Sequence, residues 1–420
     1  MRLSLAILAL TMLSANTAAA QATEQDLVRA KRILASTPLV DGHNDLAWAI
    51  RESATAPRDV ASYNLRQRTR GHTDLERLKQ GMIGAQFWSI YVPGEVKDSG
   101  FARIQLEQFD IARRFIAMYP ERLELALTAQ DVRDSFKRGR IGSLLGMEGG
   151  HTIENSLGAL RAYYALGARY MTLTHNVTLD WADAALDTSK HDGLTEFGKE
   201  VIREMNRLGM MADLSHVSPG VMSDALDVTE SPVIFSHSDA RALVDIPRNV
   251  PDSILRRLDK NGGVVMVTFV PTFISAQMSA YEAKLNEAQR QARLTMAASD
   301  SAALHAATTA WTAANPAPVV TLSQVADHIE YIRKIAGVDH VGIGGDFDGI
   351  SIVIKGLEDV STYPALFAEL VHRGWSDGDL KKLAGENVLR VLKRNEEVAD
   401  RLQKSRQPST KTIGQLDGHK

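Results

Sequence analysis

The chain has 420 residues and a net charge of −3, with 44% hydrophobic and 24% charged residues. These proportions are ordinary for a globular protein and exclude a disordered or fibrous chain. Basic and acidic residues are interspersed, so no basic patch indicates nucleic acid or an anionic membrane as a partner. The sequence has no cysteine, which excludes a thiol nucleophile, a cysteine zinc site and an iron–sulfur cluster.

The first twenty residues are typical of a secretory signal peptide. Arg2 gives a positive start, residues 3–13 form a short apolar run, and Ala18, Ala19 and Ala20 form a cleavage motif. The run is shorter than the ~20 apolar residues that a bilayer span needs. We therefore expect export to the periplasm or the medium, with cleavage near Ala20. The polar tail at 401–420 has no hydrophobic end, so we expect no membrane anchor.

Apolar runs that end in polar residues recur along the rest of the chain. Eight of them are predicted strands: 39–46, 82–92, 141–149, 170–175, 210–216, 232–237, 263–270 and 340–346. Most are continuous apolar runs, as expected for parallel strands buried on both faces. Predicted helices lie between them, for example 101–119, 156–166, 198–208, 221–228 and 322–336. This alternation predicts an α/β fold, a single (β/α)₈ TIM barrel over residues 21–400, rather than a doubly wound open sheet.

One stretch interrupts the alternation. Residues 275–318 are rich in Ala, Gln, Glu and Arg, which predicts a helical insertion after the seventh strand. Loops on that side of a barrel lie over the active site. The insertion is therefore interpreted as a lid or a contact between the subunits of a homodimer, and a solvated helical excursion explains it equally well. The charged chain after about Arg394 is expected to fray.

Histidines and acidic residues cluster where the predicted strands end. The first strand ends with His43 and Asp45, and the third with Glu148. The fifth and sixth strands end with His216 and His237. Because the carboxyl ends of barrel strands converge on one face, we expect these five residues to share a cavity. Such a cluster of charge is costly without a cation, and its nitrogen and oxygen donors suit Zn²⁺ or a similar ion.

Three further residues are candidates for binding substrate. His175 closes the fourth strand and is interpreted as a sixth metal ligand or as a group that polarises a substrate carbonyl. Arg248 follows the sixth strand, and its guanidinium suits a substrate carboxylate. The eighth strand ends with Asp346, and Asp348 lies close behind.

These segments together resemble the membrane (renal) dipeptidase family, peptidase family M19 of the amidohydrolase superfamily. The matching segments run in family order: VDGHND at 40–45, GMEGGH at 146–151, LTHN at 173–176, DLSH at 213–216, FSHS at 235–238, RNVPD at 248–252 and GDFDG at 345–349. The resemblance covers about residues 35–395. It implies two Zn²⁺ ions per chain, one held by His43 and Asp45 and the other by His216 and His237, with Glu148 as the bridge.

The resemblance also implies an activity. It predicts hydrolysis of a dipeptide by a hydroxide that bridges the two metals. His175 and Arg248 would bind the substrate, and Asp346, or otherwise Asp348, would shuttle the proton. The resemblance further implies that the enzyme tolerates a C-terminal residue of D configuration. The alternatives on the same metal site are an N-acyl-amino-acid deacylase, a lactonase or another amidohydrolase. A non-catalytic metal- or ligand-binding protein on the same scaffold is disfavoured, since no site residue is missing.

Overall fold

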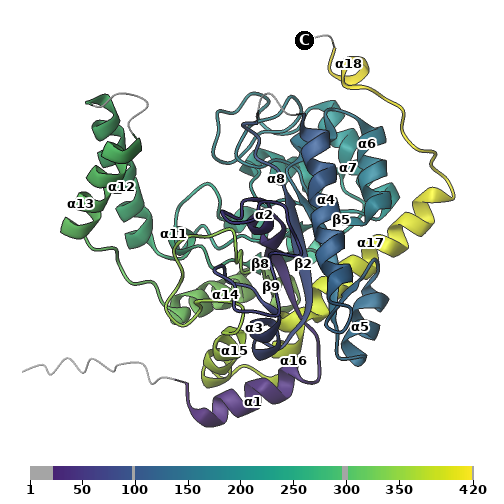
Figure 1. Ribbon diagram of the computed structural model, residues 1–420. Helices are drawn as coiled ribbons and strands as arrows, with labels where there is room; N and C mark the ends of the chain where they lie inside the picture. The colour runs from purple at the N-terminus through teal and green to yellow at the C-terminus, as the bar shows by residue number, and fades with distance from the viewer. Residues whose placement is uncertain (1–21, 97–99, 296–300, 419–420) are drawn as a thin grey trace, which may run out of the picture.

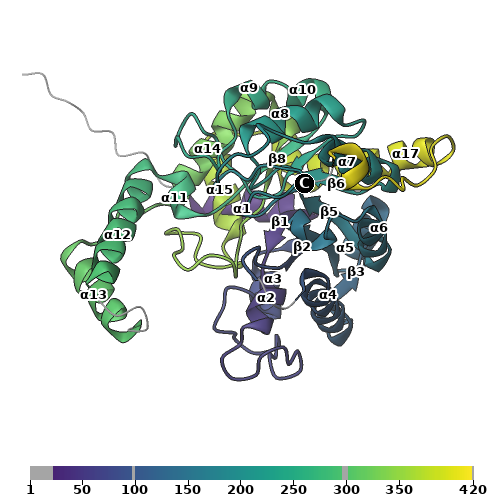
Figure 2. The same cartoon turned by 90° about the horizontal axis from the view of Figure 1, so that it is seen from above.

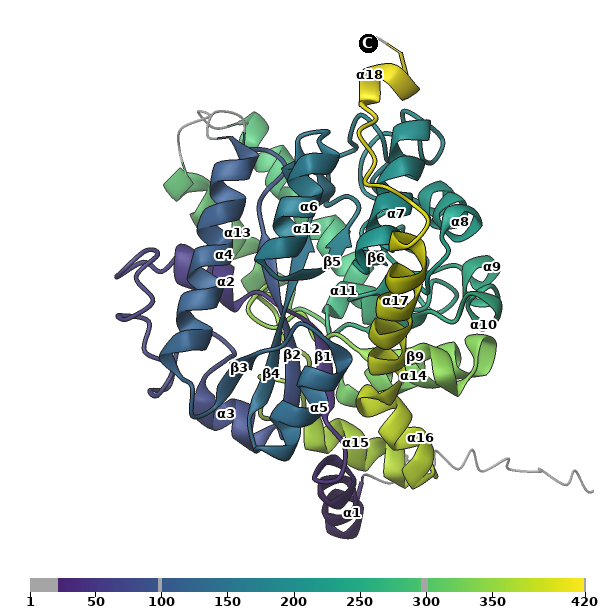
Figure 3. The ribbon, with the colours of Figure 1, turned by 90° about the vertical axis from the view of Figure 1, so that its right-hand side faces the viewer.

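The computed structural model describes residues 22–96, 100–295 and 301–418, so the signal peptide expected at residues 1–20 lies outside the described part. The described strands are β1 (Leu39–Asn44), β2 (Ile83–Tyr91), β3 (Leu123–Leu125), β4 (Ile141–Glu148), β5 (Ala168–Thr172), β6 (Met211–Asp213), β7 (Ile234–Phe235), β8 (Val264–Val267) and β9 (Val341–Ile343). Eight of them follow one another in the order β2-β1-β9-β8-β7-β6-β5-β4, and β2 also pairs with β4, which closes the ring. Every pairing is parallel, so the predicted (β/α)₈ barrel is confirmed (Figures 1 and 3).

The ninth strand, β3, was not expected from the sequence. It pairs with the first three residues of β4, on the edge of β4 that further along pairs with β5. A three-residue strand has too few alternating positions to give a pattern. It extends the sheet beside the barrel without entering the ring.

Both faces of the barrel strands are buried, which explains why the strands are continuous apolar runs. Alternate residues belong to two separate apolar clusters: Phe87 and Leu144 lie in one, and their neighbours Trp88 and Leu145 lie in the other. The smaller cluster also contains Val388 and neighbouring residues of helix α17 (Asn387–Gln403). The larger one lies between the strands and the surrounding helices.

The helices surround the barrel (Figures 1 and 2). They are α1 (Glu24–Leu34), α2 (Leu46–Arg51), α3 (Leu75–Gln80), α4 (Phe101–Met118), α5 (Ala129–Lys137), α6 (Leu157–Leu166), α7 (Glu196–Leu208), α8 (Pro219–Val228), α9 (Asp252–Leu255), α10 (Leu258–Asn261), α11 (Pro271–Ile274), α12 (Ala276–Leu294), α13 (Ser301–Ala314), α14 (Leu322–Ala336), α15 (Tyr363–His372), α16 (Asp377–Lys381), α17 (Asn387–Gln403) and α18 (Ile413–Leu416). Among the described residues, no helix combines the length and the apolar character needed to cross a bilayer.

The expectation that the chain frays after about Arg394 is wrong. Helix α17 continues to Gln403, because Val398 and Leu402 are buried against the rest of the protein. Beyond α17 the chain packs along α7, where the Ser409 hydroxyl donates to Glu200 over 2.7 Å. Polar contacts therefore hold the segment after α17 against the protein, although its polar composition predicted a solvent-exposed tail.

The insertion forms two helices, α12 and α13, which pack on each other between β8 and α14. The pair stands out from the barrel in Figures 1 and 2. The rings of Tyr281 and Trp311 join the two helices at a centroid distance of 5.3 Å. The first turn of α12 lies at the barrel, where Met278 is buried.

Candidate metal centre

The chemistry-bearing residues lie at or just beyond the carboxyl ends of the strands. His43 lies in β1 and Glu148 is the last residue of β4. The predicted strands 170–175, 210–216, 232–237 and 340–346 were too long at this end, since His175, His216, His237 and Asp346 follow β5, β6, β7 and β9 by two or three residues. The residues nevertheless reach one cavity, because the short connections after parallel barrel strands open on the same face.

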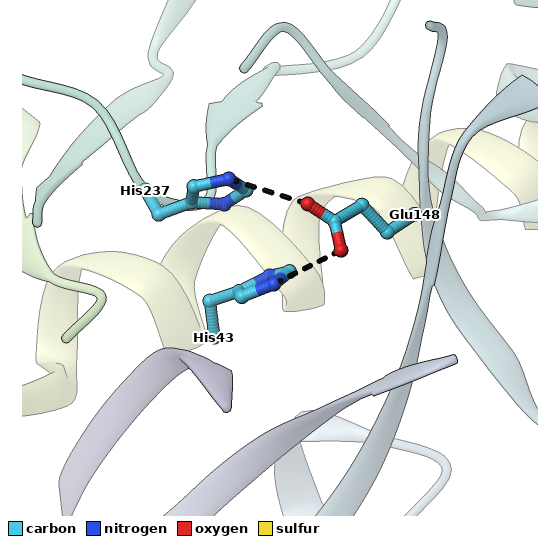
Figure 4. A group of neighbouring side chains, drawn as sticks. All are labelled: His43, Glu148 and His237. Carbon is cyan, nitrogen blue, oxygen red and sulfur yellow. Dashed lines mark ion pairs between the residues drawn. The ribbon is translucent and has the colours of Figure 1, made fainter. Parts of the chain in front are cut away.

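Glu148 lies at the centre of the cluster (Figure 4). Its Oε2 atom is 3.3 Å from Nε2 of His43, which is itself 3.3 Å from a carboxylate oxygen of Asp45. Its Oε1 atom lies 3.1 Å from Nε2 of His216 and 3.5 Å from Nε2 of His237. The two oxygens of one carboxylate therefore face two different sets of side chains.

His175 lies on the second of these sides. Its Nε2 atom is 3.8 Å from Oε1 of Glu148, and its ring centroid is 4.3 Å from that of His216. The ring of Tyr91, at the end of β2, also packs against His175, at a centroid distance of 4.8 Å. Burial lowers the pKa of His175, which favours the neutral imidazole.

The other ring nitrogens of the histidines are held by neighbours that sequence reasoning missed. Nδ1 of His43 lies 2.9 Å from the Tyr170 hydroxyl. Nδ1 of His216 lies 3.0 Å from the side-chain oxygen of Asn176, and Nδ1 of His237 lies 2.8 Å from the Ser236 hydroxyl. These contacts turn each Nε2 atom towards the cavity, as outer partners of metal-binding histidines do.

A buried carboxylate, Asp213, supports one of these contacts. It accepts hydrogen bonds from the hydroxyls of Ser236 (2.6 Å) and Thr172 (2.5 Å). Its other oxygen accepts the backbone N–H of Ser236 and of Ser215. The segments after β6 and β7 are thus tied together directly beneath His216 and His237.

The close approach of these segments also requires glycine at position 42. A Cβ atom there would lie 2.5 Å from the carbonyl oxygen of Ser236. Gly42 therefore lets the end of β1 approach the end of β7, and the rings of His43 and His237 meet at a centroid distance of 4.0 Å. A larger residue would force the first strand away from the cluster.

The electrostatics of the cluster favour a bound cation. Burial raises the pKa of Glu148, but the imidazoles of His43 and His216 outweigh burial and hold it well below its usual range. Burial lowers the pKa of both His216 and His237 well below normal. An ionised carboxylate beside the neutral imidazoles of His216 and His237 is an arrangement of electron-pair donors.

Two buried atoms test whether a metal fits. Nε2 of His43 and Oδ1 of Asp45 are shielded from solvent and have no hydrogen-bond partner among the described residues. Among the described residues, three groups have ligand atoms within 4.8 Å of one another: His43, Glu148 and His237; Glu148, His175 and His216; and His43, Asp45 and Asp346. Imidazole and carboxylate donors suit Zn²⁺ and similar divalent ions. The residues therefore fit a metal centre.

The two acidic residues after β9 have different surroundings. Asp348 exchanges two hydrogen bonds with His72: its carboxylate accepts the His72 backbone N–H over 2.6 Å, and its own N–H donates to Nδ1 over 2.9 Å. Asp346 instead joins His43 and Asp45. Its backbone has φ of 61°, in the left-handed region that non-glycine residues rarely adopt. Burial raises the pKa of Asp346 well above normal, with the His43 imidazole acting against it and Asp45 adding to it.

Arg248 is a buried cation that forms no ion pair with any described residue. Its side chain lies over the ring of Phe273 at 5.2 Å and its Nη2 atom donates weakly to the His237 carbonyl at 3.5 Å. No carboxylate of the described residues lies within ion-pair distance of it, and its Nη1 atom has no partner there. Burial lowers the pKa of this guanidinium to about 10, which still leaves it charged at neutral pH.

These groups line a cavity of about 480 Å³. Trp48 and Tyr91 contribute aromatic wall, and Met278 and Glu282 reach it from the inserted helix α12. Sequence reasoning assigned none of these four to the site, because an aromatic residue in an apolar run or a residue on an inserted helix carries no signal of its own. Cavities of this size hold small molecules.

The model of one protein family matches residues 27–406, and its description is "Membrane dipeptidase (Peptidase family M19)". The chain belongs to the membrane dipeptidase family. It is a metallopeptidase, a hydrolase that acts on dipeptides. The resemblance found in the sequence motifs is thereby confirmed.

Solved structures of other dipeptidases are similar to this chain over nearly their whole length. The probable dipeptidase PvdM of Pseudomonas aeruginosa is 23% identical, with a TM-score of 0.77 over 89% of this chain and 99% of its own. A metallopeptidase of Rhodobacter sphaeroides, liganded with a phosphinate mimic of the dipeptide L-Ala-D-Ala, is 24% identical, with a TM-score of 0.71 over 86% and 99%. The dipeptidase AC, a metallopeptidase of family M19, is 25% identical, with a TM-score of 0.69 over 86% and 98%.

Proposed function

We propose that this dipeptidase works with two Zn²⁺ ions bridged by Glu148. His43 and Asp45 would hold one ion, and His216 and His237 the other. The observation that carries the proposal is the position of Glu148, whose Oε2 faces His43 while its Oε1 faces His216 and His237. A carboxylate so placed suits two metals better than one.

When bound, two such ions polarise a substrate carbonyl and lower the pKa of a coordinated water towards ~7. The side chain of Asp346 would accept a proton from the attacking water and donate a proton to the leaving amine. The position of Asp346 beside His43 and Asp45 supports this role. The carboxylate of Asp348, by contrast, already accepts a hydrogen bond from the backbone of His72. Nε2 of His175 would donate to the developing oxyanion of the scissile carbonyl.

Arg248 would bind the free carboxylate of the substrate. A buried guanidinium with an unused Nη1 atom and no ion pair in the described structure is costly unless an anion joins it. The C-terminal carboxylate of a dipeptide supplies that anion in a bidentate geometry. The substrate would therefore end one residue beyond the scissile bond.

The proposal is tested by a kinetic screen with metal analysis. L-Xaa-L-Xaa and L-Xaa-D-Xaa dipeptides should be hydrolysed by enzyme that contains about two zinc ions per chain. L-Ala-D-Ala belongs in the screen, because the Rhodobacter sphaeroides relative was solved with a mimic of it. Faster hydrolysis of N-acyl-amino acids than of every dipeptide would overturn the proposed substrate class.

We also propose that the chain is exported and that residues 1–20 are removed. The barrel would then comprise residues 21–400 with the insertion at 275–318, followed by a polar tail at 401–420. Mass spectrometry of the protein purified from cell fractions tests this: the intact mass should correspond to a chain that begins at Gln21. Recovery of the full-length chain in the cytoplasm would contradict it.

A further inference from the structure

Glu282 is an exposed acidic residue on α12 that lines the substrate cavity. Each of the other four acidic residues of the cavity lies beside a histidine: Asp45, Glu148 and Asp346 lie beside His43, and Asp348 is hydrogen-bonded to His72. No hydrogen bond or ion pair holds the Glu282 carboxylate within the described part of the chain. The helix thus presents an uncompensated negative charge to the cavity.

An apolar wall leads to this carboxylate. Met278 lies one turn before Glu282 on the same face of α12, and Pro271 and Ile352 lie beside it in the cavity. A smaller cavity of about 220 Å³ adjoins the first and shares Pro271, Met278 and Ile352 with it. The wall therefore offers space for a long side chain whose stem is aliphatic.

The position of Arg248 indicates which residue of the dipeptide lies nearest to this wall. Its guanidinium stacks on Phe273, which precedes Met278 and Glu282 in the same segment. A substrate whose carboxylate binds Arg248 would have the side chain of its C-terminal residue nearest to this segment. Its N-terminal residue would lie further away, beyond the proposed metal centre.

We propose that Glu282 selects dipeptides whose C-terminal residue is lysine or arginine; this rests on the proposed function of Arg248. The methylene groups of such a side chain pack on Met278 and Ile352, and the cationic end reaches the Glu282 carboxylate. Long basic side chains commonly divide between apolar and charged surroundings in this way. The insertion then acts as a specificity element for the reaction.

The test compares Ala-Lys with Ala-norleucine, which has nearly the same stem and no charge. The ratio of kcat/KM for the two substrates should fall about threefold in Glu282→Gln, the scale of one partly exposed charge pair. In Glu282→Lys the ratio should fall further and Ala-Glu should become a better substrate than Ala-Lys. The wild-type ratio should also decrease as salt is added, because added ions screen the pair.

Glu287→Gln is the matched control, since Glu287 lies on the same helix and pairs with Arg290 outside the cavity. An equal change in this variant, or an unchanged ratio in Glu282→Gln, overturns the proposal. If Glu282→Gln lowers kcat/KM for Lys-Ala and leaves that for Ala-Lys unchanged, the assignment of Glu282 to the C-terminal residue is overturned. A preference for Ala-norleucine over Ala-Lys in both wild type and Glu282→Gln would show that the wall selects apolar side chains, and it would likewise overturn the proposal.

The failure of the proposed function gives a different result. If no dipeptide is hydrolysed, the proposed reaction is wrong, and binding still tests Glu282. Calorimetry would then measure the dissociation constants of phosphinate mimics of Ala-Lys and Ala-norleucine in wild type and Glu282→Gln. The preference for the lysine mimic over the norleucine mimic should fall in the variant, as expected for the ratio of kcat/KM. An equal affinity for both mimics in wild type overturns the role of Glu282 without reference to catalysis.

Discussion

The Nε2 atoms of His216 and His237 face each other at 2.8 Å. Their Nδ1 atoms are engaged by Asn176 and Ser236, so the lone pairs of both rings are directed into the cavity. Two imidazole lone pairs at this separation repel unless a proton or a cation lies between them. The pair is therefore arranged to bind an electron-pair acceptor.

Removal of metal should abolish activity. Dialysis against a chelator is expected to yield inactive protein, and addition of Zn²⁺ should restore turnover as about two ions bind per chain. The midpoint of thermal unfolding should fall on removal, because an ion that binds only the folded chain stabilises it. Full activity in metal-free protein, checked by elemental analysis, would contradict the proposed centre.

Asp346→Asn should lower kcat by about 10²–10⁴-fold, the usual contribution of a positioned acid–base group. The zinc content should stay near that of the wild type. Asp348→Asn serves as the comparison, since its carboxylate holds the backbone of His72. We expect this second variant to retain more activity, and the reverse order would assign the proton transfer to Asp348.

Arg248→Ala should raise KM for free dipeptides about 30-fold or more, as expected for the loss of a buried charge pair with the substrate. Dipeptide amides lack the carboxylate, so their kinetics should change little. Arg241→Ala is the matched control, because Arg241 pairs with Asp245 in the same connection after β7. An equal loss with free and amidated substrates would show that Arg248 has only a structural role.

Asn176→Ala should weaken zinc binding about 10–100-fold by freeing Nδ1 of His216. Competition with a chromophoric chelator measures this affinity directly. Asn155→Ala provides a control with the same substitution, since the Asn155 amide donates to exposed Asp180. Wild-type affinity in the Asn176 variant would show that the amide does not orient the ring.

Glu204→Gln should lower the free energy of unfolding by about 3 kcal/mol at neutral pH, because it breaks a buried ion pair. Burial raises the pKa of Glu204, but hydrogen bonds from Arg207 and Arg161 outweigh burial and lower it. The stabilisation is therefore present above the ordinary glutamate pKa of ~4.3 and is lost as the pH falls through the lowered value.

Urea unfolding from pH 7 to pH 3 measures this difference. The gap between wild type and Glu204→Gln should narrow at the acidic end. Glu196→Gln, on the same helix but exposed, should unfold like the wild type throughout. A gap that stays constant with pH would mean that the charge of Glu204 does not contribute.

The sequence was sufficient to predict the barrel and the residues that meet in it. Parallel strands bring their carboxyl ends to one face, so His43, Glu148 and His237 had to converge once their strands were recognised. The exact strand ends were not predictable. The His216 backbone has φ of 67°, and such a turn after an apolar run carries no pattern in the sequence.

The supporting residues could not be predicted, for a different reason. Tyr170 lies within an apolar strand and appears there as an ordinary core residue. Its hydroxyl reaches Nδ1 of His43 only because β1 and β5 contribute to the same closed ring. Glu282 likewise depends on the direction in which an inserted helix leaves the barrel.

The contact of β1 with β9 has a consequence for how the site is assembled. These two strands lie near opposite ends of the chain, and their pairing brings Asp346 to His43 and Asp45. A growing or truncated polypeptide that lacks β9 carries the proposed metal ligands on an open sheet, without the strand that joins β1 to β8 and closes the ring. Metal acquisition is therefore expected to be a late event, coupled to the last step of barrel folding.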